Sequence, residues 1–169
     1  KYIMYGEWLL SKHTVFYDHL NHYFFEFDIM EKETGKFLST EERRKKIGIA
    51  PIVSVPVLWE GIATSLDHLK SFLKPSLYKT PNWKEKLKEV AIEREQDPDK
   101  IISETNDSLL SEGLYLKIET KGEVIGRYKY VRHDFLQSIL DSGTHWLDRP
   151  IIPNQLAPGV DILSDNKPY

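Results

Sequence analysis

The chain has 169 residues, a formal net charge of −3 and no cysteine. That length suits one domain with a buried core. The lack of thiols excludes disulfide scaffolds and thiolate zinc sites, and the near-balanced charge confines any nucleic-acid surface to a local patch. No apolar run approaches the length of a membrane span and no signal peptide is recognisable, so we expect a cytoplasmic protein without a membrane partner.

Strand-like runs dominate the first part of the chain. HYFFEFDIM is the clearest of them, because aromatic and apolar residues fill it and polar turns bound it. The first run is interrupted at Gly6-Glu7, and the last has Pro56 near an edge. Strands are predicted over residues 2–10, 14–17, 22–30 and 52–58.

Helix signals follow in the middle of the chain. Ser39 and the acids after it predict the start of the first helix. Apolar residues at helical spacing mark the second, which ends before Pro75, and the third carries a thin apolar stripe typical of a solvated helix. Helices are predicted over residues 39–46, 62–73, 82–95, 98–105 and 133–140. The order of strands, helices and strands favours an α+β fold with an antiparallel sheet over a doubly wound parallel one.

SEGLYLKIETKGEVIGRYKYVR, residues 111–132, predicts a hairpin around a Lys-Gly-Glu turn. Arg127 and Lys129 are two residues apart, so they share one face of their strand and suit a clamp for phosphate oxygens. Glu112 lies at the mouth of the partner strand, where an acid suits Mg2+. Alternation places Lys117 on the other face, unless the backbone at Gly113 breaks the register. The alternative is an ordinary solvated charged face.

Two further positions suit a binding site. Glu7 lies inside an apolar run, where a carboxylate is costly to bury unless it is paired, although it also suits an edge strand facing water. Alternation places Phe25, Phe27 and Ile29 on one face. These rings suit either a core or an aromatic platform that stacks on a purine.

The remaining polar residues show no other catalytic pattern. The six histidines lack the spacing of a zinc site. Ser11, His13 and Asp18 form no recognisable nucleophile motif. We therefore expect neither a histidine metal site nor a serine hydrolase.

Taken in order, four motifs resemble those of the covalent nucleotidyltransferases, which include ATP-dependent polynucleotide ligases and mRNA capping enzymes. They are YGEW, FFEFDI, EGLYLK and GRYKYVR. The chain is most similar to the ATP-dependent RNA ligase family over residues 1–140, and GEWLLSKHTVFYDHLNHYFFEFDI is the most specific part. The resemblance implies an ATP-grasp-like nucleotidyltransferase core of antiparallel sheets flanked by helices. A DNA ligase or capping enzyme would normally continue into an OB-fold, for which the tail is too short.

The resemblance also implies a reaction that uses ATP and Mg2+ (or Mn2+). A lysine attacks the α-phosphate of ATP, AMP passes to the 5′-phosphate of an RNA, and the 3′-hydroxyl of a second end displaces it, as in RNA repair. By matching position, Glu7 would contact the ribose, Phe27 would stack on adenine and Glu112 would hold the metal. Lys117, Arg127 and Lys129 would grip the phosphates. The family usually has lysine where Arg127 stands.

One family motif, the KxDG segment with the nucleophile, has no counterpart, because the sequence contains no Asp-Gly pair. KETG and KKIG both follow the GE motif and suit a turn and a helix end. We therefore expect the lysine segment to precede Lys1 and the chain alone to be inactive. Residues 1–149 would be the C-terminal part of an adenylylation domain, and residues 150–169 would be an irregular tail. A non-catalytic nucleotide- or RNA-binding module is the alternative. RNA type and oligomeric state are left open.

Overall fold

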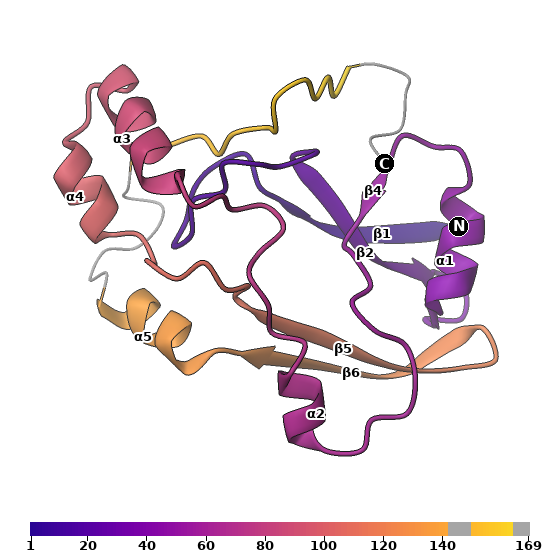
Figure 1. Ribbon diagram of the computed structural model, residues 1–169. Helices are drawn as coiled ribbons and strands as arrows, with labels where there is room; N and C mark the ends of the chain where they lie inside the picture. Colours follow the sequence, from indigo (N-terminus) through magenta and orange to yellow (C-terminus); the bar gives the residue numbers. More distant parts are fainter. Residues whose placement is uncertain (142–149, 164–169) are drawn as a thin grey trace.

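The computed structural model describes residues 1–141 and 150–163, so the end of the predicted tail, 164–169, lies outside the described residues. Strands and helices are mixed along the chain (Figure 1). The strands are β1 (Tyr2–Trp8), β2 (Phe24–Glu31), β3 (Phe37–Leu38), β4 (Val53–Ser54), β5 (Gly113–Thr120) and β6 (Glu123–Val131). The helices are α1 (Thr40–Ile47), α2 (Leu66–Lys70), α3 (Trp83–Glu93), α4 (Pro98–Ser103) and α5 (His133–Asp141).

The strands form one curled sheet in the order β1-β2-β3-β6-β5, with β4 added in parallel to β2. The other pairings between these strands are antiparallel, which confirms the predicted α+β class. In a flat sheet, β2 and β5 would lie three strand spacings apart, about 14 Å. Lys117 on β5 nevertheless lies 2.7 Å from Asp28 on β2. The sheet therefore curls until the β5–β6 hairpin faces β2 (Figure 1).

The predicted hairpin and the interruption at Gly6-Glu7 are both present. Lys121 and Gly122 have φ of 40° and 87°, the left-handed pair that closes a tight hairpin turn. In β1 the register shifts between Tyr5 and Gly6, which leaves Phe27 of β2 without an opposite residue. This bulge breaks the simple alternation predicted for Phe25, Phe27 and Ile29.

Three predicted elements are shorter than expected or missing. Residues 14–17 form no strand, because Phe16 is fully buried against α3 and α4 instead. The strand at 52–58 reduces to β4, since Pro56 has no N–H to continue a ladder. The helix at 62–73 reduces to α2, because its N-terminal cap is Ser65, and Ile62 is 91% exposed before it.

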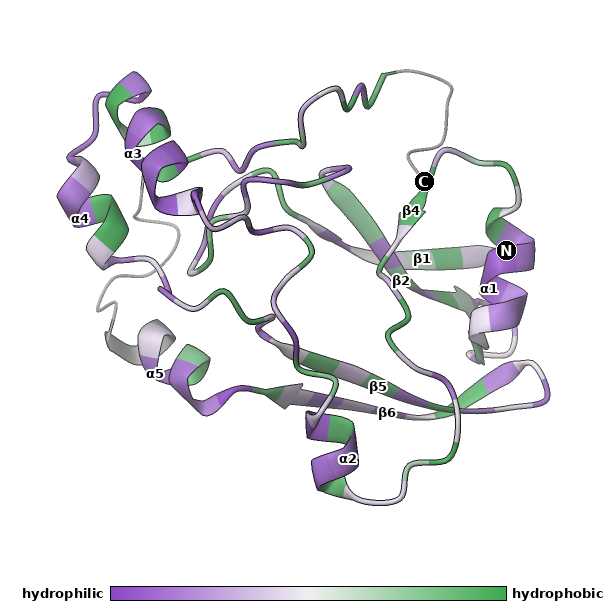
Figure 2. Cartoon of the chain, in the orientation of Figure 1, coloured by the Kyte–Doolittle hydropathy of each residue, from purple (hydrophilic) through white to green (hydrophobic). Residues whose placement is uncertain are grey.

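Helix α1 is held to the sheet by charge. It begins after Ser39, as predicted, and the Ser39 hydroxyl accepts a hydrogen bond from the Glu42 backbone at 3.3 Å. The helix is almost entirely hydrophilic (Figure 2). Its one buried side chain, Arg43, contacts the buried carboxylate of Glu26 at 2.6 Å.

The core divides into two clusters. One surrounds α3 and α4, where the predicted stripe of Trp83, Leu87 and Val90 is buried. The other lies beneath β2 and is built on Phe25. Residues 150–163 run beside the loop that follows β1 (Figure 1), and they contribute apolar side chains to both clusters. Within the two described ranges, no helix is long and apolar enough to cross a membrane.

Candidate functional site

The buried carboxylate of Asp28 gathers three side chains of the hairpin. Asp28 is fully buried on β2. Lys117 lies 2.7 Å from one of its oxygens, and Arg127 lies 3.3 Å from the other. The hydroxyl of Tyr115 donates to the second oxygen at 2.6 Å. Lys117 and Arg127 are directly opposite in the hairpin, so one carboxylate orders a cation from each strand.

The electrostatics of this group are those of a buried ion cluster. Burial lowers the pKa of Lys117, and the nearby charge of Arg43 lowers it further, while Asp28 opposes both. Burial and the hydrogen bond to Asp28 raise the pKa of Tyr115 to about 12, so its hydroxyl remains a donor. The Arg127 guanidinium lies 3.6 Å from the centre of the Phe37 ring, a cation–π contact.

Glu112 belongs to a different group at the other end of the hairpin. Its carboxylate accepts a hydrogen bond from the Tyr17 hydroxyl. Burial raises the pKa of Glu112, and the negative charge of Glu7 raises it further, while the Tyr17 hydrogen bond, Lys129 and His13 lower it. Glu7 therefore lies close enough to Glu112 to disfavour its charge, on an exposed part of the edge strand β1.

Gly113 lies where the start of β5 comes very close to β6. A Cβ at Gly113 would lie 2.0 Å from the carbonyl oxygen of Tyr130, so the backbone approaches its partner strand too closely for a side chain. The register break considered at Gly113 is not found, because Gly113 pairs in register with Val131 and the shift within β5 falls between Ile118 and Glu119. Glycine is therefore required beside Glu112 by the close approach of the two strands.

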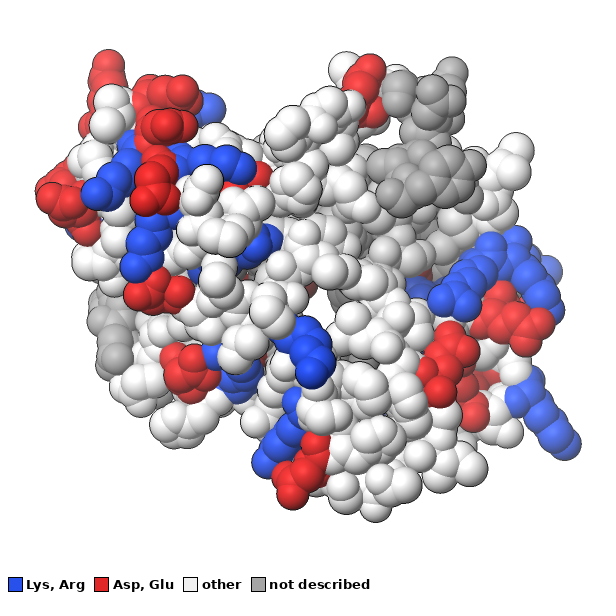
Figure 3. All heavy atoms as spheres, viewed as in Figure 1, with Lys and Arg blue, Asp and Glu red and all other residues white. Residues whose placement is uncertain are grey.

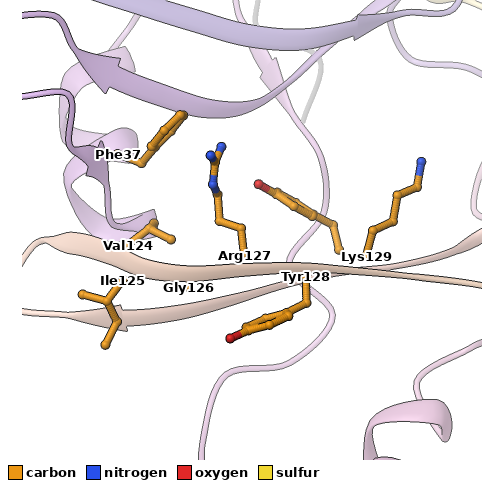
Figure 4. A pocket seen from close by; sticks show the side chains of 8 residues that line it. Phe37, Val124, Ile125, Gly126, Arg127, Tyr128 and Lys129 are labelled. Atoms are coloured by element: carbon orange, nitrogen blue, oxygen red, sulfur yellow. The ribbon is translucent and has the colours of Figure 1, made fainter.

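An open pocket of about 610 Å3 lies along β6, between the hairpin and Phe37. Arg127 and Lys129 point into it from one face, as predicted, while Tyr128 points the other way (Figure 4). Lys129 is exposed and forms no ion pair with any described residue. Elsewhere on the face shown in Figure 3, charges of both signs gather over α1 and over α3 and α4. Lys129 is thus a cation available to an anionic ligand.

The predicted site residues fall into two groups. Glu7, Glu112 and Lys129 are electrostatic neighbours. Phe27 lies with Lys117 and Arg127 around Asp28, because Lys117 also donates to the Phe27 carbonyl oxygen. The Phe27 ring meets Tyr115 edge to face, 5.7 Å between centres, and is only partly buried. Tyr115 stands opposite Lys129 in the hairpin, which joins the two groups.

Sequence reasoning assigned no role to Tyr17, Asp28 or Tyr115. The signal was present, because YD and FDI lie inside the most specific part of the resemblance. Asp18 has a structural role, because its carboxylate accepts hydrogen bonds from the Thr80 backbone at 2.7 Å and from Lys86 at 2.8 Å. It ties the start of α3 to the loop that carries Tyr17.

The donor set at Glu112 suits a hard divalent cation held largely by other ligands. Mg2+ usually binds one or two carboxylates together with substrate phosphates and water. Glu112 supplies one such carboxylate, and the rest of the coordination shell would come from phosphate and water. In the part of the chain that the structure describes, no three histidine or acidic side chains form a metal cage.

Comparison with known proteins gives one match. The sequence profile of the RNA ligase family matches residues 1–131. No curated protein and no solved structure matches the chain significantly.

Proposed function

The chain belongs to the RNA ligase family, and on that premise we propose that it is part of an ATP-dependent enzyme that joins the 5′-phosphate and 3′-hydroxyl ends of RNA. Its fold is then an ATP-grasp-like nucleotidyltransferase core, with residues 1–149 as the C-terminal part of the adenylylation domain. The reaction proceeds through an enzyme-AMP and an RNA-adenylate. The nucleophilic lysine comes from outside residues 1–169. A role in RNA repair and a cytoplasmic location remain predictions.

The observation that carries this proposal is the pocket along β6, into which Arg127 and Lys129 point from one face (Figure 4). Glu112 lies directly before β5, and the charges of Glu7 on β1 and Lys129 on β6 both act on it. The two cations offer contacts to phosphate oxygens, and the carboxylate of Glu112 offers one to a divalent cation. A nucleotide phosphate with its divalent cation supplies both of these groups.

The cations act on the transferred phosphate by position and charge. Phosphoryl transfer requires alignment and neutralisation more than covalent help from the protein. Lys129 reaches into the pocket directly. Lys117 and Arg127 are pre-ordered by Asp28, so little conformational freedom would be lost when an anion arrives. Arg127 is the more accessible of these two, with its side chain 42% exposed.

The nucleoside would lie between the two groups. Phe27 offers a partly exposed ring for adenine, and Tyr115 holds that ring from its edge. Glu7 is exposed at the edge strand, where its carboxylate would accept hydrogen bonds from the ribose hydroxyls. Glu112, with Glu7 nearby, would hold a divalent ion, which neutralises charge on the reacting phosphates when bound.

The same cations also serve the attacking lysine. That lysine must lose its proton to act as a nucleophile, and positive charge nearby lowers its pKa. Asp28 offsets part of the positive charge of Lys117 and Arg127, whereas Lys129 forms no ion pair with a described residue. A lysine placed beside Lys129 would therefore be neutral more often than one in water.

The test is incubation of the full-length protein with ATP labelled at the α-phosphate and Mg2+. We expect a protein-bound label with the acid and hydroxylamine sensitivity of a lysine phosphoramidate, and its loss in Glu112→Ala and Lys129→Ala variants that still fold. Absence of label in the wild-type protein would refute the ligase proposal. Normal labelling in both variants would refute the site assignment.

The same experiment decides the alternative. A non-catalytic module of this fold would bind ATP or RNA without forming the covalent label. Binding by calorimetry, together with no label at any Mg2+ concentration, would favour the module over the ligase.

A further inference from the structure

Asn154, in the segment after α5, is buried and uses both ends of its side-chain amide. It is 2% exposed. Its Oδ1 accepts a hydrogen bond from the Tyr17 backbone N–H at 2.8 Å, and its Nδ2 donates to the Leu9 carbonyl at 2.9 Å. Its own backbone N–H donates to the Leu10 carbonyl at 2.8 Å. A buried amide satisfied in this way fixes the segments that it joins.

The residues around Asn154 form a strap, residues 152–157, across the loop 9–20. The Gln155 backbone N–H donates to the Tyr17 carbonyl at 2.8 Å. The Leu20 N–H donates to the Gln155 carbonyl at 3.0 Å, and the Ala157 N–H donates to the Leu20 carbonyl at 2.7 Å. In Figure 1 the strap lies beside the loop that follows β1. The strap therefore holds Tyr17 at both its backbone N–H and its carbonyl.

Tyr17 passes this constraint to Glu112. Its hydroxyl donates to one carboxylate oxygen, Oε1. Among the described residues, no other hydrogen bond or ion pair reaches that carboxylate. Tyr17 is thus the one described side chain that fixes how Glu112 is turned.

A metal-binding carboxylate needs such support, because partners outside the ligand shell set the direction of its lone pairs. We propose that Asn154 is a positioning residue, which fixes the backbone of Tyr17 so that the Tyr17 hydroxyl holds one oxygen of Glu112 and leaves the other available to a divalent cation. The inference rests on the proposed function, in which Glu112 is the metal ligand. It extends the site to a segment beyond residues 1–131, where the family match ends.

The test measures the binding of Mn2+ to the full-length protein in the presence of ATP. The electron paramagnetic resonance signal of free Mn2+ reports how much of the ion is bound. Loss of a partner outside the ligand shell typically weakens metal affinity about 10- to 100-fold. We expect Asn154→Ala and Tyr17→Phe each to lose Mn2+ affinity by that factor. Their affinity for ATP, measured without metal, should be unchanged. The double variant should lose no more Mn2+ affinity than the weaker-binding single variant, because both substitutions act through the same contact with Glu112.

Gln155→Ala is the matched control, since its hydrogen bonds to the loop come from its backbone and survive the substitution. The inference would be overturned if the losses of Mn2+ affinity add up in the double variant. It would also be overturned if Asn154→Ala and Tyr17→Phe bind Mn2+ as tightly as Gln155→Ala does. If Asn154→Ala does not fold, Asn154→Ser replaces it. If neither folds, Asn154 is needed for folding itself and the inference is likewise wrong.

Glu112→Gln separates this inference from the function beneath it. If Glu112→Gln binds Mn2+ as the wild type does, Glu112 is not the metal ligand, and the proposed site fails along with the inference. If Glu112→Gln loses Mn2+ while Asn154→Ala and Tyr17→Phe keep it, only the positioning role of Asn154 is refuted.

Discussion

The hairpin faces two carboxylates that the fold treats in opposite ways. Asp28 is fully buried and contacts Lys117 at 2.7 Å, Arg127 at 3.3 Å and Tyr115 at 2.6 Å. Among the described residues, the Tyr17 hydroxyl is the hydrogen-bond partner of the Glu112 carboxylate, and Glu7, the neighbour that acts on Glu112 most strongly by charge, is another acid. Asp28 is thus neutralised by two cations of the hairpin, whereas no described residue forms an ion pair with Glu112.

This difference separates a residue that orders cations within the chain from one that, on the proposed function, binds a metal ion. A buried carboxylate with two cations around it fixes their positions, and its removal leaves those charges uncompensated. A carboxylate held beside another acid costs the fold stability, which is common where a group serves function. On the proposed function, we therefore expect Asp28 to contribute mainly to stability and Glu112 mainly to chemistry.

The largest expected effect is that of Asp28→Asn. The substitution keeps the shape of the side chain but leaves Lys117 buried without an anion, so we expect a loss of about 3–5 kcal/mol in the free energy of unfolding. Urea unfolding at neutral pH measures it. The control is Glu123→Gln, whose exposed ion pair with Lys36 should be worth about 1 kcal/mol or less. Equal losses in the two variants would remove the distinction between Asp28 and a surface acid.

Two glycines of the same hairpin test the close approach of the strands beside Glu112. In Gly113→Ala, Cβ would meet the backbone oxygen of Tyr130 at 2.0 Å, so we expect a loss of about 2 kcal/mol or more in unfolding free energy. In Gly126→Ala, Cβ would meet only side-chain atoms, at 3.1 Å or more, which can yield. Thermal melting of both variants compares them. A Gly113→Ala protein as stable as Gly126→Ala would contradict the close backbone approach at Gly113.

The two cations of β6 should also differ. Arg127→Ala removes contacts with Asp28 and with the Phe37 ring, so we expect a loss of about 1 kcal/mol. Lys129→Ala removes an exposed side chain without an ion pair among the described residues, and we expect a change within about 0.5 kcal/mol. Both are measured by urea unfolding. A larger loss for Lys129→Ala would mean that Lys129 supports the fold rather than a ligand.

The smallest effect concerns the pH dependence of Glu112→Gln. Burial raises the pKa of Glu112 above that of the unfolded chain, so its contribution to stability is present at low pH and is lost as pH rises through the folded pKa. Glutamine resembles the protonated acid and still accepts the Tyr17 hydrogen bond. The Glu112→Gln variant should therefore be more stable than the wild type at pH 8, and the difference should be smaller at pH 4. Thermal melting of both proteins at each pH measures this difference. A larger gain at pH 4 would contradict the raised pKa.

Local signals in the sequence predicted the elements that local chemistry determines. The clearest strand, the cap at Ser39 and the hairpin around Lys121 and Gly122 are present. The helix predicted over 62–73 is present only as the short α2, because apolar spacing cannot reveal that a segment has no core to cover: Leu66 is 58% exposed.

The site was predictable only where motifs carried it. Glu7, Glu112 and Lys129 were named from the order of the motifs, and in the folded chain the charges of Glu7 and Lys129 both act on Glu112. The pairing of Lys117 and Arg127 with Asp28 depends on the curl of the sheet, which no local pattern encodes. Tyr17 lies 95 residues before Glu112 and 137 before Asn154, so their contacts exist only in the folded chain.

One measurement tests the division between the two carboxylates most directly. The yield of covalent AMP label and the free energy of unfolding are measured together on full-length Glu112→Gln. We predict that the label is lost while stability at neutral pH is retained or increased. A Glu112→Gln protein that still forms the label, or one that loses label and stability together, would contradict the assignment of Glu112 to chemistry rather than to the fold.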